Sequence, residues 1–336
     1  MTLLTRGVAL AGYAEVAAEF GLDARAMLRK FGIDPRILTE RETRVPVEKV
    51  MDLLEQSAEA TGCASFGLRM AATRKLADLG PISLLFAHQP TMRDALLTRF
   101  RFQQMMHQAL AGHIEDRDDG LVVVRLEMLT SGRGRPPRQG YEMAIGSFHQ
   151  CFRLPAGPAL RMRSVHFAHA PPADPGFHHR FFGTTVQFNS EFNGFICSQA
   201  DLDRPNPVAD AALATYAERY IQTLPFANES PLAIEVQKAI HVLLPYSGAT
   251  MAAVAVRLGL GARTMQRRLA AEGADFSSLL NEIRRDHALR YLANTQVQLA
   301  DVAGLVGYCQ ETSFSRWFFG EFGVTPSGWR SSPRPA

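Results

Sequence analysis

The chain has 336 residues, of which 46% are hydrophobic and 21% are charged, and its formal net charge is +3. This composition is that of an ordinary globular protein with ample core material, and the length predicts two or three domains. The excess of positive charge lies after Glu229, where 11 basic residues, ten of them arginine, accompany 8 acidic ones. Arginine is suited to bidentate contacts with phosphate groups and guanine edges.

The four cysteines are far apart in the chain and form no CxxC pair. That spacing argues against a disulfide scaffold and a structural zinc site, and it fits a reducing cytoplasm. The N-terminal segment carries Glu15 and Glu19 where a signal peptide needs an uncharged core. No run reaches the roughly 18 apolar residues that a bilayer span needs. We therefore expect a soluble, cytoplasmic protein with no membrane partner.

The first part of the chain shows mainly helical periodicity. Apolar residues recur at helical spacing over residues 7–32 and 47–60, and a further helix is expected from about Thr91 to Leu110. The period then changes to two. The turn Asp118-Asp119-Gly120 precedes alternating apolar residues between Val122 and Met128, which predicts a hairpin with one buried face.

A basic, Gly/Pro-rich loop from Ser131 to Gly140 is followed by a predicted helix to about Phe152. Three strand-like segments come next, at residues 164–169, 184–189 and 194–197, and then a helix of about fourteen residues. Because helices and strands interleave irregularly, we predict that residues 1–222 form an α+β domain with a mostly antiparallel sheet.

Residues 223–230 are expected to be a linker, and all strand signal ends there. Ser230 and Pro231 are predicted as the N-cap and the first residue of a helix. The remainder, residues 231–336, is predicted to be an all-α domain of helices joined by short turns.

This tail contains an internal repeat. "VAVRLGLGARTMQRRL", from Val254, aligns with "VAGLVGYCQETSFSRWF", from Val302. Each copy has a short apolar helix, a turn containing glycine, and a second helix with a polar face, which is the organisation of a helix-turn-helix motif. We therefore predict two such motifs, at about residues 250–271 and 299–320, within the second domain.

The types of residue in each copy fit the motif. Ala255 and Ala303 are small where two helices must cross closely, and Gly259 and Gly307 permit a sharp turn. Four large apolar residues are predicted to face the two small cores: Met265, Leu269, Phe314 and Phe318.

The opposite face of each second helix is polar. It carries Arg263, Gln266 and Arg267 in the first copy, and the like charges of the two arginines at i,i+4 repel each other in an isolated helix. A major groove offsets that repulsion, and there arginine reads guanine and glutamine reads adenine. Double-stranded DNA is therefore the predicted partner, the alternative being an ordinary solvated face.

Between the copies, "FSSLLNEIRRDHALRYLAN" has apolar residues at helical spacing. A helix of about 18 residues would be roughly 27 Å long. That length could set the two motifs near the ~34 Å of one DNA turn, so that one chain could grip two successive segments of the major groove.

The tail resembles the DNA-binding domain of AraC/XylS-type bacterial transcription regulators over residues 231–330, through "VAVRLGLGARTMQRRLAAEGADF", "RRDHALRYL" and "VAGLVGY…SFSRWFFGEFGVTPSGWR". In that family the second helix of each motif enters the major groove. The residues matching the DNA-contacting positions are Arg263, Thr264, Gln266, Arg267, Glu311, Thr312, Ser313 and Arg316. The sequence departs from the family at Gly261, where serine is the common N-cap.

Three further arginines, Arg268, Arg284 and Arg290, are candidates for phosphate contacts. The last two have an alternative interpretation as the solvated face of the long helix between the motifs.

Residues before the tail resemble the effector-binding domain of the AraC/XylS subgroup that contains regulators of ornithine use, through "GIDPRIL", "RVPVEKVMDLLE", "ADLGPISLLFAHQPTMRDAL" and "FNGFICSQADLDRPNP". The resemblance implies a small-molecule effector, for which an amino acid or a small carboxylate is our expectation. It also implies an activator of a neighbouring catabolic operon, with RNA polymerase as a partner and with a homodimer formed through residues 1–222.

No cofactor, metal site or catalytic constellation is predicted. The adjacent His178 and His179 point apart and have no ligand spacing with nearby carboxylates. His107 and His149 are candidates for lining the effector pocket, the alternative being ordinary core or surface histidines. Two other functions stay open: an N-terminal enzyme tethered to DNA by the tail, and a constitutive DNA-binding factor whose vestigial sensor only dimerises.

Overall fold

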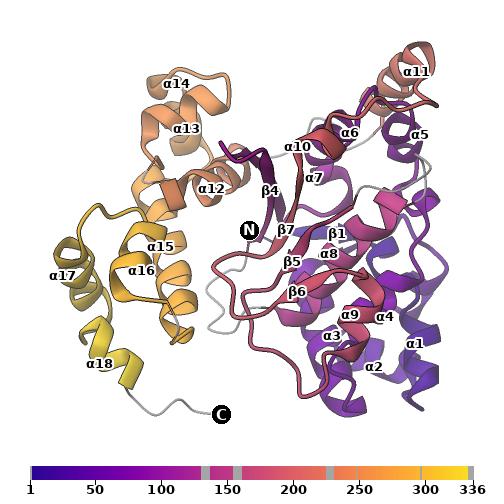
Figure 1. Cartoon of the computed structure of the whole chain (residues 1–336), viewed down its shortest axis with the longest axis horizontal. Coiled ribbons are helices and arrows are strands. Elements are labelled where there is room, and N and C mark those ends of the chain that lie inside the picture. Colours follow the sequence, from indigo (N-terminus) through magenta and orange to yellow (C-terminus); the bar gives the residue numbers. More distant parts are fainter. Residues whose placement is uncertain are drawn as a thin grey trace. The chain divides into compact units, whose positions relative to one another are not determined.

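The computed structural model describes residues 2–129, 137–153, 161–224, 231–246, 248–295 and 297–331 (Figure 1). Contacts divide the chain into two compact units, Met1–Met128 with Pro137–Glu229, and Leu129–Pro136 with Ser230–Ala336. In Figure 1 the first unit runs from indigo to magenta and the second from orange to yellow. Most of the expected basic loop and most of the expected linker at 223–230 lie outside the described residues.

The first unit is built around a five-stranded sheet with strand order β3-β4-β7-β5-β6. Its strands are β3 (Leu110–Asp116), β4 (Leu121–Met128), β5 (Ser164–His166), β6 (Thr185–Gln187) and β7 (Gly194–Ser198). Only the pair β5 and β6 is parallel within this sheet. The predicted α+β fold with a mostly antiparallel sheet is therefore confirmed.

The predicted hairpin is the pair β3 and β4, with Leu110 opposite Met128 and with Gly120 in the left-handed region at φ 75°. The prediction of a single buried face was wrong. Val123 is buried as well as Val122 and Val124, so both faces of β4 are covered at this point.

Helices pack on this sheet and on one another. They are α1 (Tyr13–Glu19), α2 (Ala24–Lys30), α3 (Val47–Thr61), α4 (Phe66–Ala72), α5 (Ile82–Ala87), α6 (Met92–Arg101), α7 (Gln103–Met106), α8 (Arg138–Arg153), α9 (Gly176–Phe182), α10 (Gln199–Leu202) and α11 (Ala211–Gln222), with 3-10 turns η1 (Gly7–Leu10), η2 (Pro35–Leu38) and η3 (Leu76–Leu79).

Two expected helices are divided in the structure. Residues 7–32 form η1, α1 and α2, because Gly12 and Gly21 adopt φ of 80° and 69° at either end of α1 and interrupt the helix. The helix expected up to Leu110 ends at Met106, and β3 begins at Leu110. The antiparallel pair β1 (Leu4–Arg6) and β2 (Arg44–Pro46) was not predicted.

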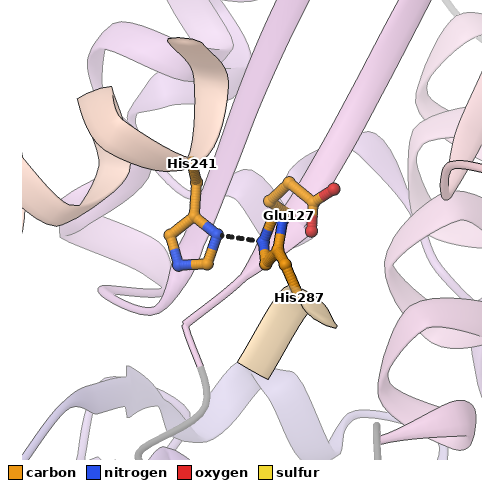
Figure 2. A group of neighbouring side chains, drawn as sticks. All are labelled: Glu127, His241 and His287. Carbon is orange, nitrogen blue, oxygen red and sulfur yellow. Dashed lines mark hydrogen bonds between the residues drawn. The ribbon is translucent and has the colours of Figure 1, made fainter. Parts of the chain in front are cut away.

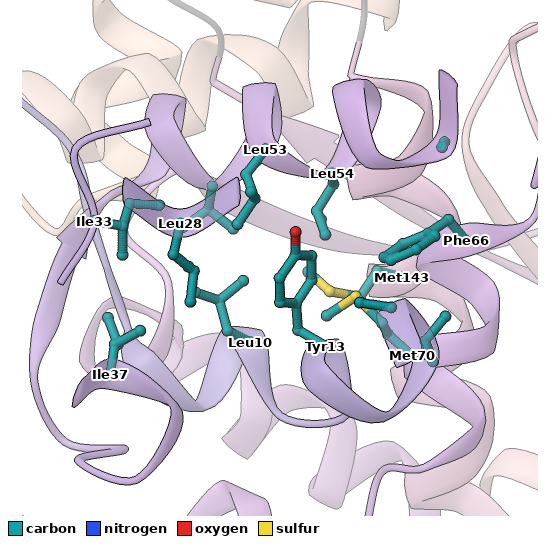
Figure 3. Close-up of a cluster of buried hydrophobic side chains, with 14 of the residues drawn as sticks. Leu10, Tyr13, Leu28, Ile33, Ile37, Leu53, Leu54, Phe66, Met70 and Met143 are labelled. Carbon is teal, nitrogen blue, oxygen red and sulfur yellow. The ribbon is translucent and has the colours of Figure 1, made fainter. Parts of the chain in front are cut away.

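The hydrophobic core of the first unit joins α1, α2, α3, α4 and α8 (Figure 3). Tyr13 points into it from α1, with its ring 5.8 Å from that of Phe66 and its hydroxyl 2.9 Å from the Ser57 hydroxyl. Helices α4 and α8 approach closely at Gly67, where a β-carbon would lie 2.2 Å from the carbonyl oxygen of Gln139. This packing fixes α8, which lines the cavity considered below.

The second unit is all-helical, as predicted. Its elements are α12 (Leu232–Leu243), η4 (Leu244–Tyr246), α13 (Met251–Arg257), α14 (Ala262–Ala271), α15 (Phe276–Ala293), α16 (Leu299–Leu305), α17 (Glu311–Phe322) and α18 (Pro326–Ser331). Within the described ranges no single helix has the length and apolar composition to cross a membrane, and one bent pair, Leu232–Tyr246 with Met251–Arg257, passes on those two criteria alone.

Helix α12 starts one residue later than expected, with Pro231 as its N-cap instead of its first residue. Proline has no side chain that can accept a hydrogen bond there. The carboxylate of Glu272, just after α14, accepts from the backbone N–H groups of Leu232 and Ala233, each over 2.9 Å. A distant acidic side chain therefore satisfies the free N–H groups of this helix end.

The second unit has two separate apolar cores that share α15. Phe276, Leu279 and Ile283 belong to the core around α13 and α14. Ala288, Tyr291 and Leu292 belong to the core around α16 and α17.

The buried His241 of α12 and His287 of α15 lie in contact (Figure 2). Their Nδ1 and Nε2 atoms, respectively, are 2.8 Å apart. Burial lowers the pKa of His287 well below the usual value, and the charges of Arg290 and His241 lower it further. Glu127, also drawn, belongs to β4 of the first unit, where the Tyr141 hydroxyl donates to it over 3.4 Å.

Candidate functional site

The first predicted helix-turn-helix motif is formed by α13 and α14. The Thr250 hydroxyl caps α13 by accepting from the backbone N–H of Ala253 over 3.2 Å. Gly259 turns the chain at φ 66°, and Ala255 is only 1% exposed where α13 meets the core. Met265 and Leu269 are buried on the inner face of α14, so the predicted roles of these residues are confirmed.

The outer face of α14 is polar and exposed. Arg263, Thr264, Gln266 and Arg267 are all exposed, and so is Arg268, which lies about 100° further around the helix. None of these side chains has a hydrogen bond or ion pair to another described residue. This helix face is therefore available to an external partner.

The N-cap of α14 is Gly261, with φ −77° and ψ 144° and no side-chain hydrogen bond. This confirms the prediction of a weak cap, because serine at the same position could accept from a free N–H of the first turn. The first N–H groups of the exposed helix therefore rely on water.

The second predicted motif is formed by α16 and α17. Gly307 adopts φ 81° in its turn, and Ala303, Phe314 and Phe318 are buried, as predicted. On the outer face Glu311, Thr312 and Arg316 are exposed and Ser313 is half-buried.

The linker helix α15 spans 18 residues, and polar contacts hold α17 against it. The Asn281 amide donates to one carboxylate oxygen of Glu321 over 3.0 Å, and Arg285 pairs with the other over 2.7 Å. Two candidate phosphate contacts are also engaged within the unit. Arg284 lies 4.9 Å from the ring centre of Tyr308, and Arg290 donates to the Tyr291 hydroxyl over 3.1 Å.

The first unit contains a cavity of about 90 Å³. Its wall is formed by β1, η1, η3, α5, α6, α7 and α8, by Arg74 and Lys75 just before η3, and by the adjoining ends of β3 and β4. At about 10–15 Å³ for each water, this space holds several waters or one small molecule.

Two arginines line this cavity. A guanidinium nitrogen of Arg74 donates to the carbonyl oxygen of Ala9 over 2.6 Å, and another donates to that of Val8. Arg99 is 9% exposed; it donates to the side chain of Gln103 and lies 5.2 Å from the ring centre of Phe148. Burial lowers the pKa of both arginines to about 10, which leaves them charged at neutral pH.

The structure places the two candidate pocket histidines differently. His107 lines the cavity. His149 does not; its ring lies 5.2 Å from those of Phe181 and Phe182. Sequence reasoning missed Arg74 and Arg99. Arg99 carried a usable signal, because it lies on the same face of α6 as the buried Met92, Ala95 and Leu96.

The adjacent His178 and His179 point apart, as expected: His178 is buried and His179 is exposed. The Nε2 atom of His178 lies 3.1 Å from the buried carboxylate of Glu142. Arg138 approaches the same carboxylate oxygen with a 3.1 Å hydrogen bond. This cluster therefore ties α9 to α8 in the core of the first unit.

Comparison with known proteins agrees with the two folds. Residues 21–206 match the arabinose-binding domain of AraC transcription regulators, and residues 234–332 match a helix-turn-helix domain. The chain is 30% identical over 329 residues to the HTH-type transcriptional regulator VirS of Mycobacterium tuberculosis, covering 98% of this chain and 96% of VirS. It is 23% identical over 328 residues to the ornithine utilization regulator of Pseudomonas aeruginosa, covering 95% and 94%.

Among solved structures, the transcriptional regulator CdpR of Pseudomonas aeruginosa aligns with 91% of this chain and 96% of its own at 20% identity and a TM-score of 0.45. The full-length relatives are transcription regulators, and the two family matches cover both units. The chain belongs to the AraC family of transcription regulators, with an effector-binding domain followed by a helix-turn-helix DNA-binding domain.

Proposed function

We propose that α14 and α17 enter two successive segments of the major groove of an operator, and that a small molecule bound in the first unit controls transcription of a neighbouring catabolic operon, most simply by activation. The observation that carries the first part is the exposed face of α14, where Arg263, Gln266 and Arg267 have no partner among the described residues. Arginine and glutamine can each make two hydrogen bonds to one base edge.

Features of α17 and α15 support binding to two segments of the major groove. Arg316 is exposed on α17, and the 18 residues of α15 give a spacer of roughly 27 Å. We assign Arg263, Thr264, Gln266 and Arg267, with Glu311, Thr312, Ser313 and Arg316, to the groove-facing surface. The exposed Arg268 is assigned to the phosphate backbone.

Further partners belong to the same proposal: RNA polymerase, for activation in the cytoplasm, and a second copy of the chain. A homodimer through the first unit is supported by α11, which leaves Leu213, Tyr216 and Tyr220 exposed. The name of the ornithine utilization regulator supports an amino acid or a related small acid as the effector class. Light scattering measures the oligomeric state directly.

The test compares Arg267→Ala with Arg268→Ala by gel shift, on the promoter fragment beside the gene and on a scrambled fragment. Arg267→Ala should weaken promoter binding by about 1–3 kcal/mol and relax the preference at one base. Arg268→Ala removes the same charge from the neighbouring position and should weaken both fragments alike. Equal promoter affinity for wild type and Arg267→Ala would show that α14 is not the reading helix.

A salt titration separates groove binding from a nonspecific surface. Binding should fall steeply with salt because the arginines displace counterions from the phosphates. The slope should become shallower by about one for each lost phosphate contact. It should therefore change for Arg268→Ala more than for Arg267→Ala.

A further inference from the structure

The cavity of the first unit has an unusual balance of charge. Arg74, which follows α4, and Arg99, on α6, both line it. The Cys151 thiol of α8 also lines the cavity and lies within electrostatic range of both guanidinium groups. Two cations from different segments of the chain therefore lie in the wall of one cavity.

The protein gives these cations no directly paired anion among the described residues. Neither arginine has an ion pair with any carboxylate in the described part of the chain. Asp78 also lines the cavity, and its negative charge acts to raise the pKa of Arg74, but its carboxylate is engaged directly by Arg41 over 3.0 Å and by the backbone N–H of Lys75 over 2.9 Å. The Cys151 thiol is neutral because burial raises its pKa to about 11.

The contacts of Arg74 and Arg99 within the protein account for only part of the burial of these two charges. Arg74 holds the backbone of η1 through the carbonyl oxygens of Val8 and Ala9, which is a structural role. Among the described residues, Arg99 donates to an amide oxygen of Gln103 and lies over the face of Phe148. Unpaired charges in a low-dielectric interior are costly, so a ligand anion would remove a penalty that the free protein carries.

The rest of the lining is mainly apolar. It includes Phe86, Met106, Leu110, Met143 and Phe148. An inorganic anion would not cover this apolar lining. An organic anion would, because its apolar body would bury the lining against itself. The guanidinium fork matches the two oxygens of a carboxylate.

We propose that this cavity binds a small organic carboxylate, with its carboxylate group at Arg99 and Arg74 and its apolar body against Phe86 and Phe148. The proposal rests on the proposed function of the first unit as a sensor, and it names the chemical class of the effector. Arg99 is the specificity-determining residue, because Arg74 also has its structural role.

The experiment uses the full chain and pairs of compounds that differ in charge. Wild-type protein is heated in the presence of butyrate, hexanoate, benzoate or phenylacetate and, separately, of the matching primary amide. A carboxylate that binds should raise the melting temperature in proportion to its concentration over its Kd. The amide of the same shape should give no comparable shift.

Titration calorimetry on variants then locates the site. Arg99→Gln should weaken binding of the stabilising carboxylate by about tenfold or more, because one charge-assisted contact is lost. Arg99→Lys should keep part of the affinity. The control Arg25→Gln removes an exposed arginine of α2 and should bind as wild type does. Circular dichroism of each variant verifies the fold.

The proposal is overturned if no carboxylate stabilises the wild-type chain more than its amide does, or if Arg99→Gln keeps the wild-type Kd. Both outcomes differ from a failure of the proposed function. If a neutral or cationic compound changed promoter affinity, the first unit would still be a sensor, and only the proposal that its effector is an anion would be wrong. If Arg267→Ala bound the promoter as tightly as the wild type, the assignment of α14 as the reading helix would be wrong, and the proposal for the cavity would be unaffected.

Discussion

The indole N–H of Trp317 on α17 donates a hydrogen bond of 2.8 Å to the side-chain oxygen of Asn281 on α15. The amide nitrogen of Asn281 donates in turn to Glu321, one turn further along α17. One amide of α15 thus holds two residues of α17, which sets the rotation of α17 about its own axis.

The first prediction concerns this pair. Asn281→Ala should cost about 1–3 kcal/mol of unfolding free energy, because a half-buried indole N–H is left without its acceptor. Promoter affinity should fall too, although neither reading face is changed. A double-mutant cycle with Trp317→Phe, measured by denaturant unfolding, should give a coupling energy above ~0.5 kcal/mol. Additive effects would mean that this hydrogen bond does not hold α17.

The second prediction compares two glycines. Gly307 has φ 81°, and a β-carbon there would lie 3.0 Å from Leu244 Cδ1. Gly307→Ala should therefore destabilise the chain by about 1–3 kcal/mol. Gly320, inside α17, has nothing within 4 Å of its added β-carbon, so Gly320→Ala should stabilise by about 0.5–1 kcal/mol. Thermal unfolding of both variants measures the difference, and shifts of the same sign would contradict the turn geometry.

The third prediction concerns the cap of α14. A β-carbon at Gly261 would lie 3.9 Å from its nearest neighbour, the Thr264 hydroxyl, so serine fits without strain. Gly261→Ser should stabilise the helix by a few tenths of a kcal/mol, and Gly261→Ala should lack that gain. Hydrogen exchange at the Arg263 and Thr264 amides measures the effect locally. Unchanged exchange in the serine variant would show that no cap forms.

The fourth prediction concerns acid. Burial lowers the pKa of His166 to about 4, and the Arg125 charge adds to this; burial likewise lowers that of His169 to about 4. Since the unfolded chain takes up protons near pH 6.5 and the folded chain does not, unfolding free energy should fall as the pH drops from about 6.5 to 4.

Thermal unfolding at a series of pH values checks this dependence, with each kcal/mol lost lowering the melting temperature by roughly 2–4 °C. His166→Gln is the control, because its side chain cannot titrate. The melting temperature of this variant should fall less steeply between pH 6.5 and 4 than that of the wild type. Identical slopes would show that His166 is not kept neutral by the fold.

The second domain was predictable because its signals are local. The two copies share glycines at their turns and small alanines at their crossings, and both pairs take the predicted places. The 18-residue length of α15 also followed from apolar spacing. The strands β1 and β2 were missed because three residues are too few to show a period of two.

The cavity could not be predicted from local patterns. Its lining joins Thr5, Arg74, Arg99 and Cys151, which are far apart in the chain. They come together because α8 packs against α4 and β4, α6 packs against α7 and β3, and α7 packs against β1. A single arginine in a helix is usually a solvated residue, so the charge on the apolar face of α6 gains its meaning only from the tertiary structure.

Because α15 is shared between two cores, its length sets the rotation of one helix-turn-helix motif relative to the other. Ile283 belongs to one core and Ala288 to the other, and the helix is continuous between them. One residue inserted there would turn the second motif by about 100° and shift it by about 1.5 Å. Seven inserted residues would nearly restore the rotation while adding about 10 Å. The facing direction of the two motifs is therefore set by residue count in α15, independently of the side chains that each motif presents.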